Sequence, residues 1–257
     1  MIQTFNEFHG SNLLSEGFLI KDDHIVFEPT SDAIINTSFG KGSNLEPYGM
    51  KLPFGEMFSV YKKASSADKK EYQEVLSALK GQSSQYTMDL DSYDKFLKRT
   101  ALYLSKIVTQ NKIDTIIVLD TSSKLLPDLM IKMNRYLPKY YDIHTYNKGL
   151  FKNPNISEIQ ISRQYNLQDK TIRELQRVLD KANQDQYFSI KKVPTQFRQV
   201  IKNWLIVNDK ILSQIVDKNV MIVDDIITTG TTAKEAASLI QDAGAASLIG
   251  ISIIKGI

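Results

Sequence analysis

The stretch that decides the fold is Val220-Met-Ile-Val-Asp-Asp-Ile-Ile-Thr-Thr-Gly-Thr-Thr232. Its first four residues are apolar without alternation, as expected of a strand that is covered on both faces. Two adjacent carboxylates, Asp224 and Asp225, follow at the end of that strand. A short turn rich in hydroxyl groups then leads into a helix that we predict from about Thr232 to Ala243. A buried strand that leads through a polar turn into a helix is typical of an α/β protein with a mostly parallel sheet.

The turn in this stretch is suited to hold a phosphate. The amide hydrogens in the first turn of a helix have no acceptor within the helix, and the helix dipole favours an anion there. Gly230 lets the backbone approach an anion closely. A charge-assisted hydrogen bond contributes about 1.5–3 kcal/mol, so several on one phosphate would dominate binding. The hydroxyl donors of the turn are Thr228, Thr229, Thr231 and Thr232.

The two carboxylates cannot face that same phosphate. They suit the hydroxyl groups of an attached sugar, or a magnesium ion with its shell of water. Two other kinds of site also place acids after an apolar strand. A Walker B element would need a Gly-x-x-x-x-Gly-Lys-Ser/Thr motif, which the sequence does not contain. The acidic pocket of a receiver domain follows the first strand of its fold, whereas only residues 233–257 come after this motif.

The stretch resembles the loop of type I phosphoribosyltransferases that binds phosphoribosyl pyrophosphate (PRPP). The resemblance implies that Asp224 and Asp225 hold the ribose hydroxyls, act as the catalytic pair and contact Mg²⁺ indirectly, through the ribose or water. It implies that the 5′-phosphate is held by Thr228, Thr229, Gly230, Thr231 and Thr232. A strand, turn and helix without any ligand is the structural alternative.

Two further segments fit the family more loosely. Asp120-Thr121-Ser122-Ser123-Lys124 follows a predicted strand, Thr115–Leu119, where the family has its pyrophosphate-binding loop. Residues 147–200 form an irregular stretch where the family has a mobile loop that closes over the site, and Val193–Gln196 is similar to the competence-type (ComF-like) branch. An ordinary surface charge is the alternative role of Lys124 and of the four cations that could meet pyrophosphate there, which are Arg163, Lys191, Lys192 and Arg198.

The rest of the sequence predicts a two-part chain. Residues 113–257 are expected to form the phosphoribosyltransferase core, a Rossmann-like parallel sheet, with 147–200 as a mobile insertion. Residues 17–112 are expected to form an N-terminal hood of strands and helices, including a hairpin turn at Lys21-Asp22-Asp23. The remaining predicted elements are helices at Asp68–Leu79, from Asp91, at Leu125–Tyr136 and at Arg173–Lys181, and strands at Tyr140–Ile143 and Ser247–Ile254.

The first residues carry a second resemblance. Residues 1–16, and the sequence Leu14-Ser-Glu16-Gly17 in particular, are similar to the capsid-targeting peptide of T-even-like bacteriophage internal proteins. Those peptides end at a protease site of the form Leu/Ile-x-Glu before Gly or Ala. The resemblance implies cleavage after Glu16, packaging in a phage head and delivery into the host. An ordinary amphipathic first helix is the alternative.

Composition excludes several classes of function. The 257 residues include no cysteine, which excludes a disulfide scaffold, thiol catalysis and cysteine-ligated metal centres. With 32 basic and 29 acidic side chains the net charge is +3, so bulk charge gives no case for nucleic-acid binding. No apolar run reaches the roughly 18 residues that span a bilayer. We therefore expect a cytoplasmic protein, in the host cytoplasm or the virion interior if it is encoded by a phage.

These observations lead to one expected function and two alternatives. The expected function is Mg²⁺-dependent transfer of a 5-phosphoribosyl group from PRPP to a nitrogenous base or similar small-molecule acceptor, with release of pyrophosphate. The first alternative is a non-catalytic regulator that binds PRPP or a nucleotide. The second is a phage-packaged effector of host nucleotide metabolism. A homodimer is compatible with each of them.

Overall fold

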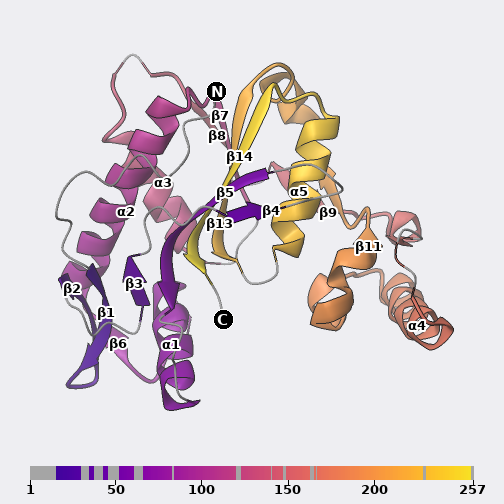
Figure 1. Ribbon diagram of the computed structural model, residues 1–257, viewed down its shortest axis with the longest axis horizontal. Coiled ribbons are helices and arrows are strands. Elements are labelled where there is room, and N and C mark those ends of the chain that lie inside the picture. The colour runs from indigo at the N-terminus through magenta and orange to yellow at the C-terminus, as the bar shows by residue number, and fades with distance from the viewer. Residues whose placement is uncertain are drawn as a thin grey trace.

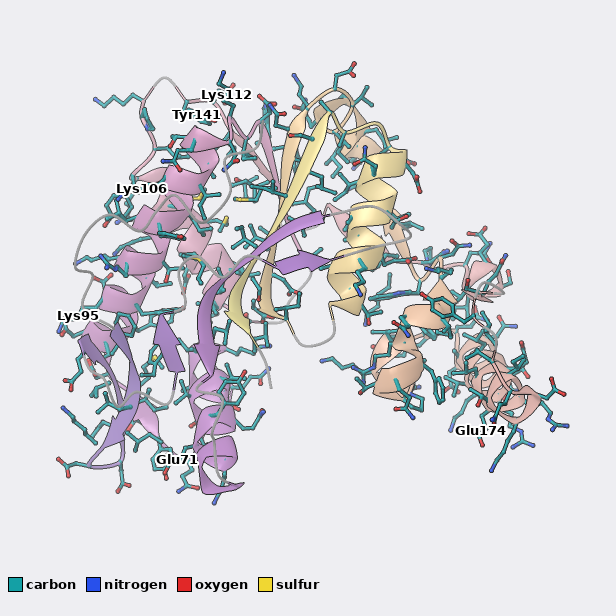
Figure 2. All side chains as sticks on the ribbon, in the orientation of Figure 1. Glu71, Lys95, Lys106, Lys112, Tyr141 and Glu174 are labelled. Atoms are coloured by element: carbon teal, nitrogen blue, oxygen red, sulfur yellow. The ribbon has the colours of Figure 1, made fainter. Side chains whose placement is uncertain are left out.

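The computed structural model shows an α/β protein built on one large sheet (Figure 1). It describes residues 16–29, 35–37, 43–45, 52–60, 66–82, 84–119, 123–139, 141–146, 149–162, 165, 167–227 and 230–255. Among these residues, no helix has the length and apolar character needed to cross a membrane. Charged side chains such as Lys95, Lys106 and Lys112 are exposed on the surface (Figure 2).

The centre of the large sheet is parallel. Its neighbouring strands are, in order, β5 (Leu52–Val60), β14 (Ser247–Lys255), β13 (Asn219–Ile227), β7 (Thr115–Val118) and β8 (His144–Tyr146). The expected α/β class and Rossmann-like parallel sheet are confirmed. The strand pattern at 220–223 therefore did indicate a central strand, which extends through the acidic pair to Ile227.

Side chains of β13 alternate between two cores, because successive residues of a strand face opposite sides of a sheet. Met221 and Val223 pack into the core that holds α2 (Leu90–Gln110) and α3 (Leu125–Asn134). Val220 and Ile222 pack into the core that holds α5 (Thr231–Asp242). Figure 1 shows α2 and α3 on one side of the sheet and α5 on the other. Strand β13 is buried on both faces, and it fixes where the acidic pair emerges.

The N-terminal region shares this sheet and one of its cores. Strands β1 (Glu16–Lys21) and β2 (His24–Pro29) form the expected hairpin, with Asp22 and Asp23 at positive φ in the turn, as a two-residue hairpin loop requires. The sheet continues through β3 (Ile35–Thr37) to β5, with β4 (Ser43–Leu45) paired to β5 and β6 (Thr87–Met88) to β2. Helix α1 (Ser66–Leu79) packs against the same core. The proposed boundary at 112/113 stays a prediction, and the sheet runs across it.

The segment between β8 and β13 forms small elements of its own. Two antiparallel pairs join β9 (Leu150–Lys152) to β12 (Leu205–Val207) and β10 (Gln160–Ile161) to β11 (Ile201–Lys202). Helix α4 (Asp169–Asp185) extends the predicted helix at both ends and lies at the far right of Figure 1, away from the main sheet. Four short 3₁₀ turns complete it, at Ile156–Glu158, Ile190–Lys192, Thr195–Val200 and Asp209–Gln214.

One predicted strand is wrong. We expected a strand at Tyr140–Ile143, but the strand that pairs with β7 begins at His144. The amide of Tyr141 donates instead to the carbonyl of Pro138 over 2.9 Å, which makes a turn there. The aromatic pair had suggested a strand, and local turn formation after Pro138 overrode that preference.

Candidate functional site

The turn that we predicted to bind a phosphate lies between the end of β13 and the start of α5. Gly230 is the N-cap of α5 and has φ 70° and ψ 11°, a left-handed conformation that glycine adopts without steric cost. Its carbonyl accepts the amide of Lys234 over 2.8 Å, which closes the first turn of the helix. Thr228 and Thr229 lie outside the described residues. The helix N-terminus is thus where the sequence placed it, behind a glycine that only a few residue types can replace.

A cavity of about 60 Å³ opens at this helix N-terminus. Water occupies about 30 Å³ in the liquid, so the cavity has room for roughly two waters or one small anion. It brings together the end of β13, the start of α5 and part of the segment between β8 and β13. The residues that line it are Ile190, Arg198, Asp224, Ile226, Ile227, Gly230, Thr231 and Thr232. Four residues that we had assigned to the site, Asp224, Gly230, Thr231 and Thr232, therefore meet around one space.

The two carboxylates interact directly. The amide of Asp225 donates to Oδ1 of Asp224 over 2.9 Å. Burial, and secondly the neighbouring charge of Asp225, raises the pKa of Asp224 to about 7. Asp224 can thus exchange a proton near neutral pH.

Asp225 has a cationic partner that sequence reasoning missed. Nζ of Lys80 lies 2.9 Å from Oδ2 of Asp225. Lys80 directly follows α1, about 140 residues before the motif, so no local pattern connects the two. The predicted end of a helix before Gly81 did place Lys80 at a helix terminus, which was the single available signal.

Of the three candidate cations that the structure describes, Arg198 is the one that lines the cavity. Its Nε donates to the carbonyl of Val193 over 2.9 Å, and its Nη2 donates to the carbonyl of Lys191 over 3.4 Å. These two bonds orient the planar guanidinium group, so less rotamer freedom remains to be lost when it binds an anion. Lys191 and Lys192 are exposed on the same turn as Ile190, and Arg163 lies outside the described residues.

The proposed pyrophosphate loop follows Leu119 in the chain. The amide of Leu119 donates to the carbonyl of Val223 over 2.9 Å, so Leu119 lies at the carboxyl end of β7, beside the strand that leads into the turn. Ligands of open α/β sheets bind beyond the carboxyl ends of the strands. Lys124 is exposed and is the N-cap of α3, and Ser123 is buried. Asp120, Thr121 and Ser122 lie outside the described residues.

The described residues contain no group of three or more acids or histidines that could hold a metal by itself. Mg²⁺ usually keeps several waters and is bound by one or two carboxylates together with substrate phosphates. Asp224, which lines the cavity, fits that kind of site. The donor set therefore suits a magnesium ion that arrives with a phosphorylated ligand.

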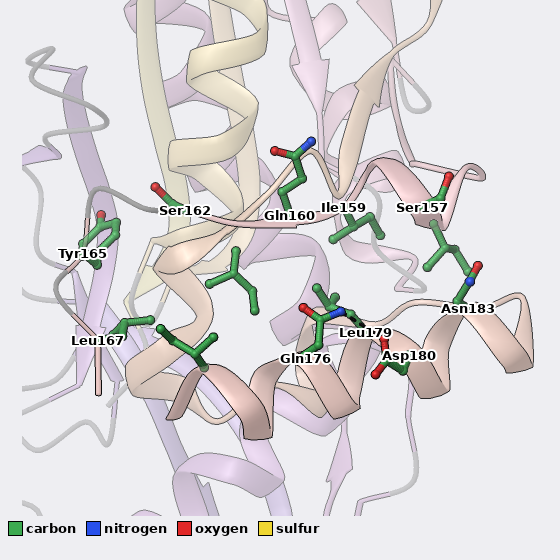
Figure 3. Close-up of a pocket in the computed structure, with 13 residues that line it drawn as sticks. Ser157, Ile159, Gln160, Ser162, Tyr165, Leu167, Gln176, Leu179, Asp180 and Asn183 are labelled. Atoms are coloured by element: carbon green, nitrogen blue, oxygen red, sulfur yellow. Dashed lines mark hydrogen bonds between the residues drawn. The ribbon is translucent and has the colours of Figure 1, made fainter. Parts of the chain in front are cut away.

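A much larger cavity, about 850 Å³, lies away from the turn (Figure 3). It is formed by β10, the 3₁₀ turn before it and α4. Its polar side chains include Gln160, Gln176, Asp180 and Asn183, and no Lys or Arg is among the described residues that line it. A phosphate group would find no counter-charge there, so the small cavity at α5 is the better anion site.

Comparisons with known proteins point to one family. Residues 167–256, which include β13, the turn, α5 and β14, match the family model described as the phosphoribosyl transferase domain. A search of curated proteins gives no match.

Two of the solved structures that match this chain do so over about two thirds of its length. One is the glutamine PRPP amidotransferase from B. subtilis in complex with ADP and GMP, at 17% identity and a TM-score of 0.35, covering 68% of this chain and 30% of that chain. The other is described as the allosteric regulatory enzyme of purine biosynthesis, at 18% identity and a TM-score of 0.30, covering 62% and 26%. The chain thus spans less than a third of either protein, and the assignment depends on the family model.

Proposed function

We propose that the protein transfers the phosphoribosyl group of PRPP to a nitrogen acceptor and releases pyrophosphate, because residues 167–256 match the model of the phosphoribosyl transferase domain. One observation carries the proposal beyond the family. The cavity at the N-terminus of α5 is lined by Asp224, Gly230 and Arg198 together. The carboxylate of Asp224 can accept a hydrogen bond from a sugar hydroxyl, and the helix N-terminus and the cation can bind the attached phosphate.

In this proposal the first turn of α5 binds the 5′-phosphate, with Thr231, Thr232 and Arg198 as further donors. Asp224 and Asp225 accept hydrogen bonds from the ribose hydroxyls. These contacts fix the sugar while its C1′–O bond loosens and positive charge develops on the ring. Mg²⁺, when bound, would neutralise charge on the pyrophosphate leaving group. The segment 120–124, which follows Leu119 in the chain, is the proposed contact for pyrophosphate.

The carboxylate pair supplies proton chemistry as well. A nitrogen acceptor sheds a proton as it bonds to C1′. A group with a pKa near the working pH is best suited to take up that proton, and the pKa of Asp224 is about 7. Asp224 is therefore the proton acceptor in our proposal, and Asp225 is the partner that keeps it basic.

A regulator that binds PRPP without turnover is favoured by the position of the 850 Å³ cavity, which lies away from the proposed ribose site and has no Lys or Arg in its described lining. The predictions of packaging in a phage head, of a homodimer and of a cytoplasmic location rest on the sequence alone. Sequencing the N-terminus of protein taken from particles would test cleavage after Glu16.

Calorimetry with PRPP, with and without Mg²⁺, tests the proposed function. We expect binding that strengthens with Mg²⁺, and release of pyrophosphate with at least one purine, pyrimidine or pyridine acceptor. Asp224→Asn combined with Asp225→Asn should abolish the binding, while far-UV circular dichroism shows that the variant folds. Binding without release for every acceptor would favour the regulator. Undiminished PRPP affinity in the double variant would overturn both.

A further inference from the structure

Lys80 is held in place by the end of α1. The amide of Gly81 donates to the carbonyl of Ala78 over 3.0 Å, and the amide of Gln82 donates to the carbonyl of Ser77 over 2.8 Å. With Gly81 at φ 67°, this is the Schellman pattern that ends a helix, and Lys80 is its C-cap residue. The backbone that carries Lys80 is thus fixed by hydrogen bonds.

The helix itself is anchored in the core below the acidic pair. Tyr72, Val75 and Leu79 of α1 are almost fully buried in the cluster that also contains Val223. Val223 directly precedes Asp224 on β13. Helix α1 and the strand that ends in the acidic pair are therefore packed into one core, so their relative position is set by apolar contacts rather than by the ion pair.

The ion pair between Lys80 and Asp225 is sheltered from solvent. The Lys80 side chain is 23% exposed and that of Asp225 is 8% exposed. Removal of one partner from a sheltered pair leaves the other charge uncompensated. Here that charge would also stand beside Asp224, whose carboxylate repels it. Loss of Lys80 would therefore displace the carboxylates of Asp224 and Asp225, whereas loss of an exposed surface ion pair has little effect.

We propose that Lys80 is a positioning residue for the acidic pair: its ammonium group holds Asp225 in place beside Asp224 before the sugar phosphate binds. The proposal rests on the proposed function, because it assigns the N-terminal region a role at the same site. It predicts that a residue before 113 contributes to binding through the acidic pair. It also adds a positive charge on the side of the acidic pair, which favours an anionic ligand.

Three variants test the proposal by calorimetry with PRPP and Mg²⁺. Lys80→Met should lower the affinity for PRPP about tenfold, which is an ordinary size for coupling between a supporting group and a site. Lys80→Arg keeps the charge and should restore most of that loss. Lys70→Met removes an exposed lysine from the same helix and should leave the affinity unchanged. Unchanged or higher affinity in Lys80→Met, or no recovery in Lys80→Arg, would overturn the proposal.

A second measurement separates this proposal from the proposed function, since it needs no ligand. Thermal unfolding of Lys80→Met, of Asp225→Asn and of the double variant forms a cycle. We expect the double variant to lose less melting temperature than the sum of the single losses. Additive losses would show that the two side chains do not interact, and the positioning role would fall. Absence of PRPP binding by the wild-type protein would instead overturn the proposed function, and the cycle would still decide whether the ion pair exists.

Discussion

The backbone amide of Asp225 donates a hydrogen bond to the carboxylate oxygen Oδ1 of Asp224, its neighbour on the same strand, over 2.9 Å. This bond favours the ionised form of Asp224. Burial and the charge of Asp225 oppose it and prevail, since the pKa of Asp224 rises to about 7. The acidic pair therefore stores repulsion when no ligand is present, and this has a consequence for stability.

That repulsion predicts how Asp224→Asn changes stability with pH. The pKa of Asp224 rises on folding from 3.8 to about 7, so between these values the folded state holds a proton that the unfolded state has lost. The free energy of unfolding of the wild-type protein therefore falls as pH rises through this window. Asparagine has no such dependence. We expect the melting temperature of Asp224→Asn, relative to wild type, to increase from pH 4 to pH 7 and to level off above it.

The advantage at pH 8 should be about 2–4 °C for each 1 kcal/mol of repulsion that is removed. Differential scanning calorimetry at pH 4, 5, 6, 7 and 8 measures it. The wild-type reference at each pH cancels the contributions of other titrating groups, such as Glu235, whose pKa is also raised by burial. A difference between the two proteins that stays constant over this range would contradict the raised pKa.

Gly230 predicts a loss of binding that can be separated from a loss of stability. A residue with a Cβ at φ 70° costs about 1–2 kcal/mol, so Gly230→Ala should lower the melting temperature by several degrees. Gly244→Ala is the matched control, because Gly244 also has a positive φ, 92°, and lies at the other end of the same helix. A Cβ added there would meet no atom closer than those of the Val216 side chain, at 3.9 Å. Calorimetry should show weaker PRPP binding for Gly230→Ala alone. Equal affinities would mean that the turn does not touch the ligand.

Elements with a strong local pattern could be predicted from the sequence. The strand at 220–223, the helix after Gly230 and the left-handed cap at Gly244 each depend on residues that are close together in the chain. Local backbone preferences and burial on both faces act on the same few residues there, so their signals agree.

Distant contacts could not be predicted in the same way. Strand β5 contains Pro53 and Gly55, which weaken a strand pattern, and it pairs in parallel with β14 nearly 200 residues later. Lys80 meets Asp225 through the packing of α1, not through any motif. The sequence did not distinguish Arg198 from three other candidate cations. In the fold, hydrogen bonds to two backbone carbonyls orient its side chain. These features depend on tertiary contacts, which the periodicity of apolar residues in the sequence does not predict.

Arg198 predicts a specific loss of anion affinity. A hydrogen bond to a charged group contributes about 1.5–3 kcal/mol, so Arg198→Met should weaken PRPP binding roughly 10- to 100-fold. Arg198→Lys keeps the charge but loses the two hydrogen bonds to backbone carbonyls that orient the side chain. We expect a smaller loss of PRPP affinity for this variant than for Arg198→Met. Arg177→Met, which removes an exposed cation from α4, is the control for net charge. If the Arg198 and Arg177 variants bind PRPP equally well, the cation of the site lies elsewhere.

Glu235 predicts how firmly the segment between β8 and β13 is attached to α5. The Glu235 side chain is buried, and its Oε1 accepts the amide of Asn203 over 2.8 Å. Glu235→Ala leaves that amide without this acceptor, at a cost of about 1–3 kcal/mol. Glu235→Gln keeps an acceptor but removes the charge that favours the buried ammonium group of Lys202, whose pKa is lowered by burial. We therefore expect the melting temperature to fall most for alanine and by an intermediate amount for glutamine.

Hydrogen exchange locates the effect within the chain. The amide of Asn203 should lose protection in Glu235→Ala and keep most of it in Glu235→Gln, because an opened hydrogen bond exposes its donor to solvent. Amides of β13 and β14 should stay protected in both variants, since their partners in the parallel sheet are unchanged. Equal protection of Asn203 in wild type and Glu235→Ala would contradict the contact.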